Sequence, residues 1–253
     1  MDRGRPYEGT YAAAFEDREV AGVVAHYWNQ NLVLQAPACL DALWRAAVEA
    51  SGRPIGGLLG PLDQVRAVEG ALDIDDSNAQ LDETEKLYDL RLDELSVPGS
   101  LGSGELTGRR IEARDLDLVT AWRIAYACET LGEEDSPKLR ARCRASVERS
   151  LEEQRTWVLE DQGVPVACSS FNAVIGEAVQ VGGVWTPPGL RRRGYGRAAV
   201  AASLLDARAA GATEAILFTG EDNIAAQKAY VALGFRQVGS YRMLLLRSPI
   251  RVR

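Results

Sequence analysis

The chain has 253 residues, of which 46% are hydrophobic and 26% are charged, a composition typical of soluble globular proteins. It contains no apolar run near the 18 residues that a transmembrane helix requires. Its N-terminal stretch carries charges but no apolar core, which excludes a secretory signal and predicts a cytoplasmic protein that binds no membrane.

The net charge of −7 is spread unevenly along the chain. Residues 1–105 carry 8 basic and 19 acidic side chains, a net charge of −11, whereas residues 106–253 carry 21 and 17, a net charge of +4. This asymmetry indicates two units with different roles. The acidic half also argues against a nucleic-acid partner, because phosphates favour a broadly basic surface.

In the first part of the chain, apolar residues alternate between strand and helix patterns. A hairpin is expected around Asn29 to Asn31, and Pro61 suits the first turn of a helix. The predicted elements are strands at 22–28 and 31–37, a helix with Leu40, Leu43, Trp44, Ala47 and Val48 on its apolar face, a strand at 54–61, a helix at 62–72 and a strand at 83–95.

A stretch rich in glycine and serine, residues 95–108, predicts a linker. It places a boundary near residue 102, between an accessory α/β domain at 1–102 and a second domain at 103–253. The second domain is predicted to contain a short strand and helix start at 109–119 with the helix continuing to Glu129, a helix at 136–155 capped by Ser136, a hairpin at 156–171, a strand at 176–185, a helix at 198–212, a strand at 214–220, a helix within 221–235 and a strand at 240–248.

This order predicts an α/β fold with a mixed sheet. The strand–helix–strand–helix–strand order of the first part recurs at the end of the second, which indicates an internal repeat of topology with slight sequence identity. Two glycines inside the strand at 176–185 predict a bulge or a close approach of another backbone.

The four cysteines, Cys39, Cys128, Cys143 and Cys168, show no CxxC spacing, and His26 is the only histidine. These counts exclude a histidine-based zinc site, and a Ser-His-Asp triad unless His26 serves in it. We expect structural roles for the thiols and for His26, a reducing compartment and no bound metal.

The sequence GLRRRGYGRAA, residues 189–199, lies between an apolar strand and a helix. Glycines there allow close approach of a ligand and leave backbone N–H groups free, and the helix N-terminus adds a positive dipole end. The pattern Arg191-x-x-Gly194-x-Gly196 therefore predicts an anion cradle suited to a pyrophosphate; the alternative is a solvated basic loop. The series Asn223-x-x-Ala226-x-x-x-Tyr230-x-x-x-Gly234-Phe235 follows it after one strand.

With these two motifs in this order, residues 108–247 resemble the GNAT superfamily of N-acetyltransferases. The resemblance implies the acyl-CoA N-acyltransferase fold, a mixed and mainly antiparallel twisted sheet flanked by helices. It implies acetyl-CoA as the cosubstrate, an unidentified primary amine of a small molecule or peptide as the acceptor, and direct transfer between them. The first part then resembles a degenerate GNAT-like half that lacks the glycine loop and binds no CoA.

The resemblance also implies a role for individual residues. Backbone groups of one strand end would pair with the pantetheine arm, amides of the arginine stretch would hold the pyrophosphate, and Tyr230 would stand near the thioester sulfur as the acid for the leaving thiolate. The implied cofactor-binding residues are Val184, Trp185, Thr186, Arg191, Arg192, Arg193, Gly194, Tyr195, Gly196, Arg197, Asn223, Ala226 and Tyr230.

The general base is not evident from the sequence. The family often has a carboxylate at the centre of the strand that here carries Gln180 and Gly182; Glu177 stands only at its start. Glu129 is the candidate base, with a solvated surface role or deprotonation through ordered water as alternatives. A non-catalytic acyl-CoA-binding sensor or scaffold is the alternative function, and either a monomer or a homodimer fits.

Overall fold

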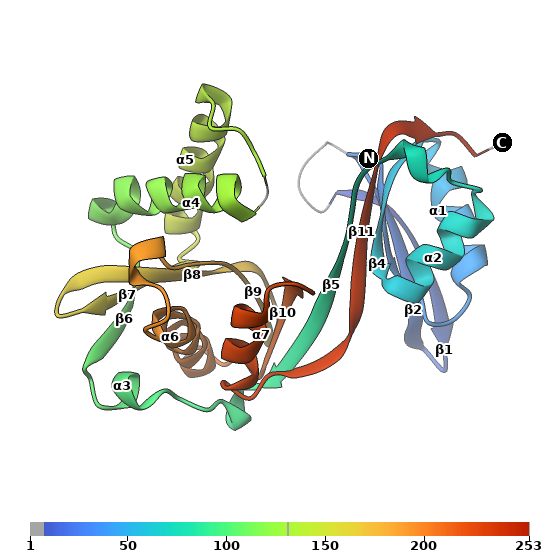
Figure 1. Cartoon of the computed structure of the whole chain (residues 1–253). Coiled ribbons are helices and arrows are strands. Elements are labelled where there is room, and N and C mark those ends of the chain that lie inside the picture. The colour runs from blue at the N-terminus through green and yellow to red at the C-terminus, as the bar shows by residue number, and fades with distance from the viewer. Residues whose placement is uncertain (1–7, 131, 253) are drawn as a thin grey trace. The chain divides into compact units, whose positions relative to one another are not determined.

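The structure is a computed structural model that describes residues 8–130 and 132–252, and its contacts divide the chain into two compact units (Figure 1). The first unit contains the chain up to Leu87, Gly220–Asp222 and the residues from Gly239 onward. The second contains Tyr88–Thr219 and Asn223–Val238. This division differs from a single boundary near residue 102, because two strands pass from one unit into the other.

The strands of the first unit follow the order β1-β2-β3-β4-β11-β5. β1, β2 and β3 are antiparallel, β3 and β4 are parallel, and β4 is antiparallel to β11. Its elements are β1 (Gly9–Glu16), β2 (Glu19–Tyr27), β3 (Asn31–Gln35), α1 (Leu40–Ser51), β4 (Ile55–Pro61), α2 (Leu62–Ala71), a short 3₁₀ turn (Asp76–Asn78), most of β5 (Ala79–Arg91) and most of β11 (Arg236–Ile250).

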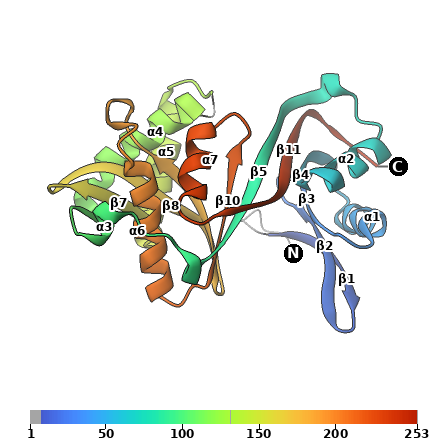
Figure 2. The same ribbon diagram turned by 60° about the horizontal axis from the view of Figure 1, so that its bottom comes forward.

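Both helices of this unit pack into one apolar core with strands of the sheet (Figure 2). Trp44 of α1 and Val65 of α2 are buried against Leu32 and Leu58 of the strands. The predicted hairpin, helices and strands of this part are present. β1 was not among the predicted elements, because its alanine-rich sequence GTYAAAFE lies at the sheet edge and shows no clear alternation of apolar and polar residues.

The second unit has the strand order β10-β9-β8-β7-β6. β10 and β9 are parallel, and β9, β8, β7 and β6 are successively antiparallel. Its elements are α3 (Gly99–Gly102), β6 (Leu106–Arg110), α4 (Leu116–Thr130), α5 (Pro137–Glu152), β7 (Thr156–Asp161), β8 (Val164–Ile175), β9 (Ala178–Trp185), α6 (Tyr195–Ala209), β10 (Glu214–Gly220) and α7 (Ile224–Val231), with 3₁₀ turns at Leu92–Glu94, Ala113–Asp115 and Pro188–Leu190.

Helices cover both faces of this sheet (Figure 1). On one face, α6 and α7 pack on Trp157 and Phe171. On the other face, α4 and α5 pack on Val158, Cys168 and Trp185. The mixed, mainly antiparallel α/β sheet predicted from the sequence is confirmed.

Residues 95–108 do not form a free linker. Leu95 is buried in the core of the second unit, and the N–H of Ser96 donates to the carbonyl of Leu233 at 3.0 Å. α3 and the start of β6 follow within the same stretch. Glycine and serine here support tight turns and a four-residue helix, which the sequence pattern alone does not distinguish from a linker.

The two units share one series of elements. Three antiparallel strands are followed by a helix, a strand parallel to the third strand, and a second helix; the series are β1-β2-β3-α1-β4-α2 and β7-β8-β9-α6-β10-α7. The predicted repeat of topology is therefore present. β5, which ends the first series, contributes Tyr88 and Leu90 to the core of the second unit, and β11 contributes Leu244 and Leu246 to the core of the first.

Within the described residues, no helix is long and apolar enough to cross a membrane. Across that same part of the chain, no group of three His, Cys, Asp or Glu side chains has an arrangement that holds a metal ion.

Candidate active site

A bulge in β9 sets the geometry of the site. Cys168 of β8 pairs with Trp185, but Ser170 pairs with Gly182, so β9 has one residue more than β8 over this interval. Gly183 adopts the left-handed conformation there, with φ of 60°, which favours glycine. The bulge predicted from the two glycines is confirmed.

β9 and β10 pair only up to this bulge. The parallel register runs from Ala178 and Glu214 to Val181 and Leu217. β9 then continues to Trp185 and β10 to Gly220 without further pairing between the two strands. The edge of β9 that faces β10 is therefore open to an extended ligand from Gly182 onward.

The helix α6 starts beside this opening with a series of unused backbone N–H groups. The first N–H that donates to a helix carbonyl is that of Ala198, to Gly194 at 3.0 Å. No protein acceptor is recorded for the N–H groups of the six consecutive residues Arg192–Arg197. Gly194 caps the helix with φ of 81°, and Arg192 has φ of 64°. Amides at a helix N-terminus form an anion-binding site.

Two further details fit an anion of phosphate type at this helix end. The Nε atom of Arg197 is buried and has no hydrogen-bond partner in the protein. A Cβ atom on Gly196 would lie 3.3 Å from Oγ1 of Thr186, so any larger residue would crowd the space between α6 and the end of β9. Tyr195 fixes the helix start, since its ring is buried and its hydroxyl donates to Asp161.

Arg191 does not point at this cradle. Its Nη1 atom lies 2.6 Å from Oε1 of Glu129, its Nε donates to the carbonyl of Thr186 at 3.0 Å, and its guanidinium lies 4.8 Å from the ring centroid of Trp185. The hydrogen bond from Arg191 holds the pKa of Glu129 below its usual value. A carboxylate in a two-pronged ion pair is a weak base, so Glu129 fits the role of a tether between α4 and the loop before α6 better than that of the general base.

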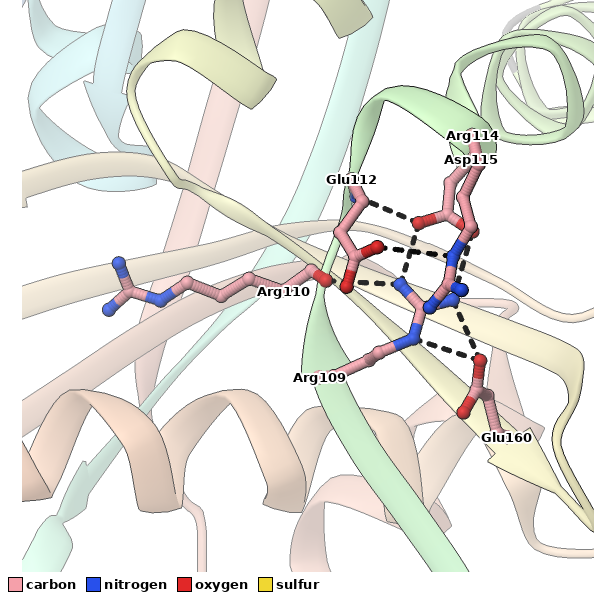
Figure 3. A network of polar contacts seen from close by, with 6 residues as sticks. All are labelled: Arg109, Arg110, Glu112, Arg114, Asp115 and Glu160. Atoms are coloured by element: carbon pink, nitrogen blue, oxygen red, sulfur yellow. Dashed lines mark hydrogen bonds and ion pairs between the residues drawn. The ribbon is translucent and has the colours of Figure 1, made fainter.

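A polar network anchors the start of α4 to the sheet (Figure 3). The carboxylate of Asp115 accepts hydrogen bonds from Nη1 and Nη2 of Arg109 at 2.6 and 3.0 Å and from the backbone N–H of Glu112 at 2.8 Å. Arg109 also reaches Glu160 of β7 at 2.7 Å. Glu112 and Asp115 form a reciprocal capping box. The network fixes the helix that carries the next group of residues.

α4 presents an aromatic and cationic cluster to the β9 bulge. The rings of Tyr126 and Trp185 meet edge to face with centroids 6.2 Å apart, and the guanidinium of Arg123 lies 5.3 Å from the Tyr126 ring centroid. Tyr230 of α7 is 8% exposed; burial and the neighbouring Tyr126 raise its pKa above the usual range. A tyrosine is protonated at neutral pH, and a raised pKa makes it hold that proton more firmly, so Tyr230 is a hydrogen-bond donor.

The sequence of the second unit matches the Acetyltransferase (GNAT) family over residues 119–235, a range that contains the bulge, the amide cradle and Tyr230. These residues form a GNAT acetyltransferase domain. Membership implies an acyl-CoA cosubstrate. A search of curated proteins finds no match to this chain.

Solved structures of similar fold cover nearly the whole chain. A GCN5-related N-acetyltransferase from Kribbella flavida has 18% identity and a TM-score of 0.57, with 94% of this chain and 90% of that chain covered. A GNAT acetyltransferase from Colwellia psychrerythraea has 13% identity and a TM-score of 0.57, with 94% and 86% covered. A tandem GNAT protein from the clavulanic acid biosynthesis pathway has 13% identity and a TM-score of 0.56, with 96% and 85% covered. The similarity of fold therefore extends over both units.

Asn223 and Ala226 of the GNAT domain stand at the start of α7. The side chain of Asn223 accepts a hydrogen bond from the N–H of Ala226 at 3.2 Å and so caps the helix. Ala226 is partly buried against the core of the unit. This cap is a structural role for Asn223, and its implied contact with the cofactor stays a prediction.

The strand end of the GNAT domain is only partly available to a pantetheine arm. Trp185 pairs with Cys168 on one edge of β9, and the carbonyl of Thr186 is occupied by Arg191. Val184 and Trp185 retain the edge that faces β10. The pKa of the Cys168 thiol is raised to about 12 by burial, which agrees with the structural role expected for it.

Two features near the bulge were not singled out from the sequence. The first is Arg123, whose only sequence signal is a lone cation inside the apolar run LVTAWRIAYA. The second is a series of hydroxyls: Oγ of Ser170 and Oγ1 of Thr156 are 2.8 Å apart, and Oγ1 of Thr156 and Oγ of Ser150 are 2.5 Å apart. These three residues come from β8, β7 and α5, so no local pattern indicates that they meet.

Proposed function

We propose that this chain is an N-acetyltransferase that moves an acetyl group from acetyl-CoA to a primary amine of a small molecule or peptide by direct transfer. The amine nitrogen attacks the thioester carbonyl, the C–N bond forms and the C–S bond breaks. The amine loses one proton and the leaving sulfur gains one. The observation that carries the proposal is the row of unused amides at Arg192–Arg197 beside the unpaired edge of β9.

Acyl-CoA fits these residues in two ways. Its pyrophosphate would accept hydrogen bonds from the α6 amides and meet the unpartnered Nε of Arg197. Its pantetheine arm would lie along β9 from Gly182 to Trp185, in the manner of an added strand. Bound acyl-CoA supplies the activated acetyl group, and the protein supplies its orientation and the handling of protons.

Tyr230 is the proposed acid. Its raised pKa keeps the hydroxyl protonated across the physiological range, so it can donate a hydrogen bond to the leaving sulfur. The nearby Tyr126 contributes to the raised pKa of Tyr230, and the ring of Tyr126 in turn contacts the ring of Trp185 edge to face.

The proposed path for the amine proton is the hydroxyl series Ser170, Thr156 and Ser150. Gly182 stands at the centre of β9, where a carboxylate side chain would serve as the base. Ser170 Oγ lies 3.4 Å from the Cβ position of Gly183, at the bulge. Each hydroxyl would accept one proton and pass another along the series, and Ser150, which is half-buried on α5, would deliver the proton to solvent water.

The first unit is proposed to bind no CoA. At the equivalent point between β3 and β4, a Cβ on Gly60 would lie 2.8 Å from the carbonyl oxygen of Leu34, so the strands stay in contact. The N–H of Ala36 is already bonded to Oε1 of buried Gln64 at 2.8 Å. We therefore expect one acetyl-CoA per chain.

A thermal shift with acetyl-CoA tests the cradle. A ligand that binds only the folded state raises Tm, and at one hundred times its Kd it adds about 2.7 kcal/mol of stability. Gly196→Leu keeps a good helix former in α6 but fills the space beside Thr186. Gly70→Leu is the matched control, because Gly70 lies in α2 with open space around its Cβ position.

We expect acetyl-CoA to raise the Tm of the wild type and of Gly70→Leu, but not that of Gly196→Leu. An equal shift in all three would place the cofactor elsewhere, and the absence of any shift in the wild type would refute the assignment. A non-catalytic acyl-CoA-binding protein is the second candidate, favoured by Gln180 and Gly182 in place of a carboxylate on β9. Release of CoA thiol with any amine of a broad panel excludes it; a Cys39→Ser background removes the exposed protein thiol from the assay.

A further inference from the structure

We propose that Arg123 binds a carboxylate carried by the acceptor, so that the preferred substrates are amino acids or other amines with a nearby carboxylate. The inference rests on the proposed acetyltransferase function and names the substrate class of that same site. Arg123 lies on α4, next to the bulge at which the acetyl group would be presented.

Arg123 is a partly buried cation that contacts the Tyr126 ring but has no carboxylate or carbonyl partner among the described residues. Among the described residues, the arginines that are not fully exposed nearly all donate to carboxylates or backbone carbonyls; they are Arg53, Arg109, Arg110, Arg144, Arg155 and Arg242. Of the described arginines that are not exposed, only Arg123 and Arg197 lack a hydrogen bond or ion pair. None of the Arg123 nitrogens is fully buried, so solvent reaches the guanidinium and a ligand anion can reach it too.

Arg123 also stands at the right place for the acceptor. Its Nη1 atom lies 3.0 Å from the Cβ position of Gly183, and Ser170 Oγ lies 3.4 Å from the same point. Glycine at the bulge therefore leaves room for the guanidinium against the backbone. A substrate bound by Arg123 would have its amine near the same short segment of β9 and near the first hydroxyl of the proposed proton path.

The neighbours of Arg123 do not neutralise it. Its recorded neighbours are the Tyr126 ring and the thiols of Cys143 and Cys168. Two acidic residues at the end of α4 and just after it are engaged elsewhere: Glu129 pairs with Arg191, and Glu133 pairs with Arg142. The positive charge is left for a ligand.

The anion is not the pyrophosphate of CoA. The cradle belongs to α6, which packs on the sheet face formed by Trp157 and Phe171, whereas α4 packs on the opposite face with Val158 and Cys168. Arg123 and the amide cradle therefore serve different faces of the sheet. The acetyl group carries no charge, so the carboxylate has to come from the second substrate. Planar guanidinium pairs well with a carboxylate, in a two-pronged geometry.

The test compares matched acceptors in the full chain. Each amino acid of a panel is paired with its carboxamide and with the amine that lacks the carboxylate. The wild type is expected to show a kcat/KM for the carboxylate member that is about 10- to 100-fold higher, the range for a charge-assisted hydrogen bond. Arg123→Gln should abolish that preference, so that the ratio of kcat/KM values is about one, by raising the KM for the carboxylate member. Arg149→Gln, at an exposed arginine of α5, should retain the preference.

A binding readout accompanies the kinetics. With CoA present, an N-acetyl amino acid, the expected product, should raise the Tm of the wild type but not that of Arg123→Gln. The shift given by acetyl-CoA alone should be equal in both, which shows that the variant is folded and that the cradle is intact.

Three outcomes would overturn the inference and leave the acetyltransferase function standing. The first is equal use of amines with and without a carboxylate. The second is an equal loss of kcat for every acceptor in Arg123→Gln, which would place Arg123 on the thioester carbonyl. The third is a preference for succinyl-CoA over acetyl-CoA that disappears in the variant, which would place the carboxylate on the acyl chain. Failure of the proposed function differs from all of these, because no amine would then release CoA.

Discussion

Glu129 and Arg191 are joined by a two-pronged ion pair, with contacts of 2.6 and 3.0 Å between the last turn of α4 and the loop that precedes α6. The same arginine lies over Trp185 and holds the carbonyl of Thr186. The pair thus connects the helix that carries Arg123 to the loop that leads into the amide cradle.

Glu129→Gln is expected to leave kcat within about twofold of the wild type, because exposed ion pairs contribute little and the carboxylate already has a lowered pKa. A general base would lose about 10²- to 10⁴-fold. Steady-state kinetics with a saturating amine distinguish the two, with Glu133→Gln as the control, since Glu133 forms a comparable exposed pair with Arg142. A large fall in kcat confined to Glu129→Gln, with loss of the acidic limb of the pH profile, would restore Glu129 as the base.

Tyr230→Phe is expected to lower kcat by about 10²-fold or more and to leave the acetyl-CoA thermal shift unchanged, because it removes the proton donor but keeps the ring. Its raised pKa also predicts that wild-type activity shows no alkaline loss from this group below about pH 10. Tyr241→Phe is the matched control: it is a half-buried tyrosine of β11 whose pKa burial raises to about 12. Similar kcat values for the two variants would exclude Tyr230 as the acid.

Local sequence patterns predicted most elements and the amide cradle. The glycines at 183, 194 and 196, the helix caps and the alternation of strands and helices are local signals, and each corresponds to a bulge, a helix start or an element of the structure. A local pattern carries no information on which strand of a repeat completes which sheet. The exchange of β5 and β11 between units, and the packing of Leu95 into a core, depend on contacts far apart in sequence.

Some parts of the candidate site could likewise be predicted from local sequence and others could not. The amide cradle is one continuous segment, so the spacing of its glycines and arginines in the sequence predicts it. Arg123 is a candidate site residue only because α4 brings it next to the bulge at Gly183. Glu129 is paired rather than free only because Arg191, 62 residues away in the sequence, donates to it. The hydroxyls of Ser150, Thr156 and Ser170 meet through packing of a helix on two strands.

Thr156→Val tests the proposed proton path. The substitution removes the middle hydroxyl of the series, and we expect kcat to fall about tenfold at neutral pH, a partial loss of proton-transfer assistance, with KM for acetyl-CoA unchanged. Ser203→Ala is the control, because it removes a buried hydroxyl paired with Ser169 at 3.1 Å on the opposite sheet face. Equal kcat values for both variants would show that the hydroxyl series is only structural.

His26 makes the stability of the first unit sensitive to mild acid. It is fully buried, with Nε2 at 3.2 Å from the carbonyl of Pro54 and Nδ1 at 2.7 Å from Oγ of Ser51, and burial lowers its pKa from 6.5. A lowered pKa in the folded state means that stability is fully present above the unfolded-state pKa and is lost as the pH falls toward the folded-state value.

We therefore expect the urea concentration at the unfolding midpoint of the wild type to decrease as the pH is lowered from about 7.5 to 5.5. Because His26 is the only histidine, the His26→Asn variant should be less stable at pH 7.5 but show a flatter dependence over this interval. Unfolding followed by tryptophan fluorescence gives the measurement. An equal slope in the variant would assign the acid sensitivity to carboxylates.

Asp115→Asn tests the anchor at the start of α4. The side chain of Asp115 is 5% exposed and that of Arg109 is 22% exposed, so the substitution leaves a partly buried guanidinium short of charge and weakens the capping box. We expect a loss of about 2–3 kcal/mol, below the 3–5 kcal/mol of a fully buried pair. Asp117→Asn is the matched control on the next turn: Asp117 pairs with Arg144 but its side chain is 94% exposed, so its loss should stay within about 0.5 kcal/mol. Chemical denaturation of both variants measures the difference in the free energy of unfolding.

The same substitution has a kinetic consequence, because α4 positions Arg123. The Asp115→Asn protein should show a higher KM for the acceptor while its acetyl-CoA thermal shift persists. A destabilised protein with an unchanged acceptor KM would show that α4 keeps its place without this network.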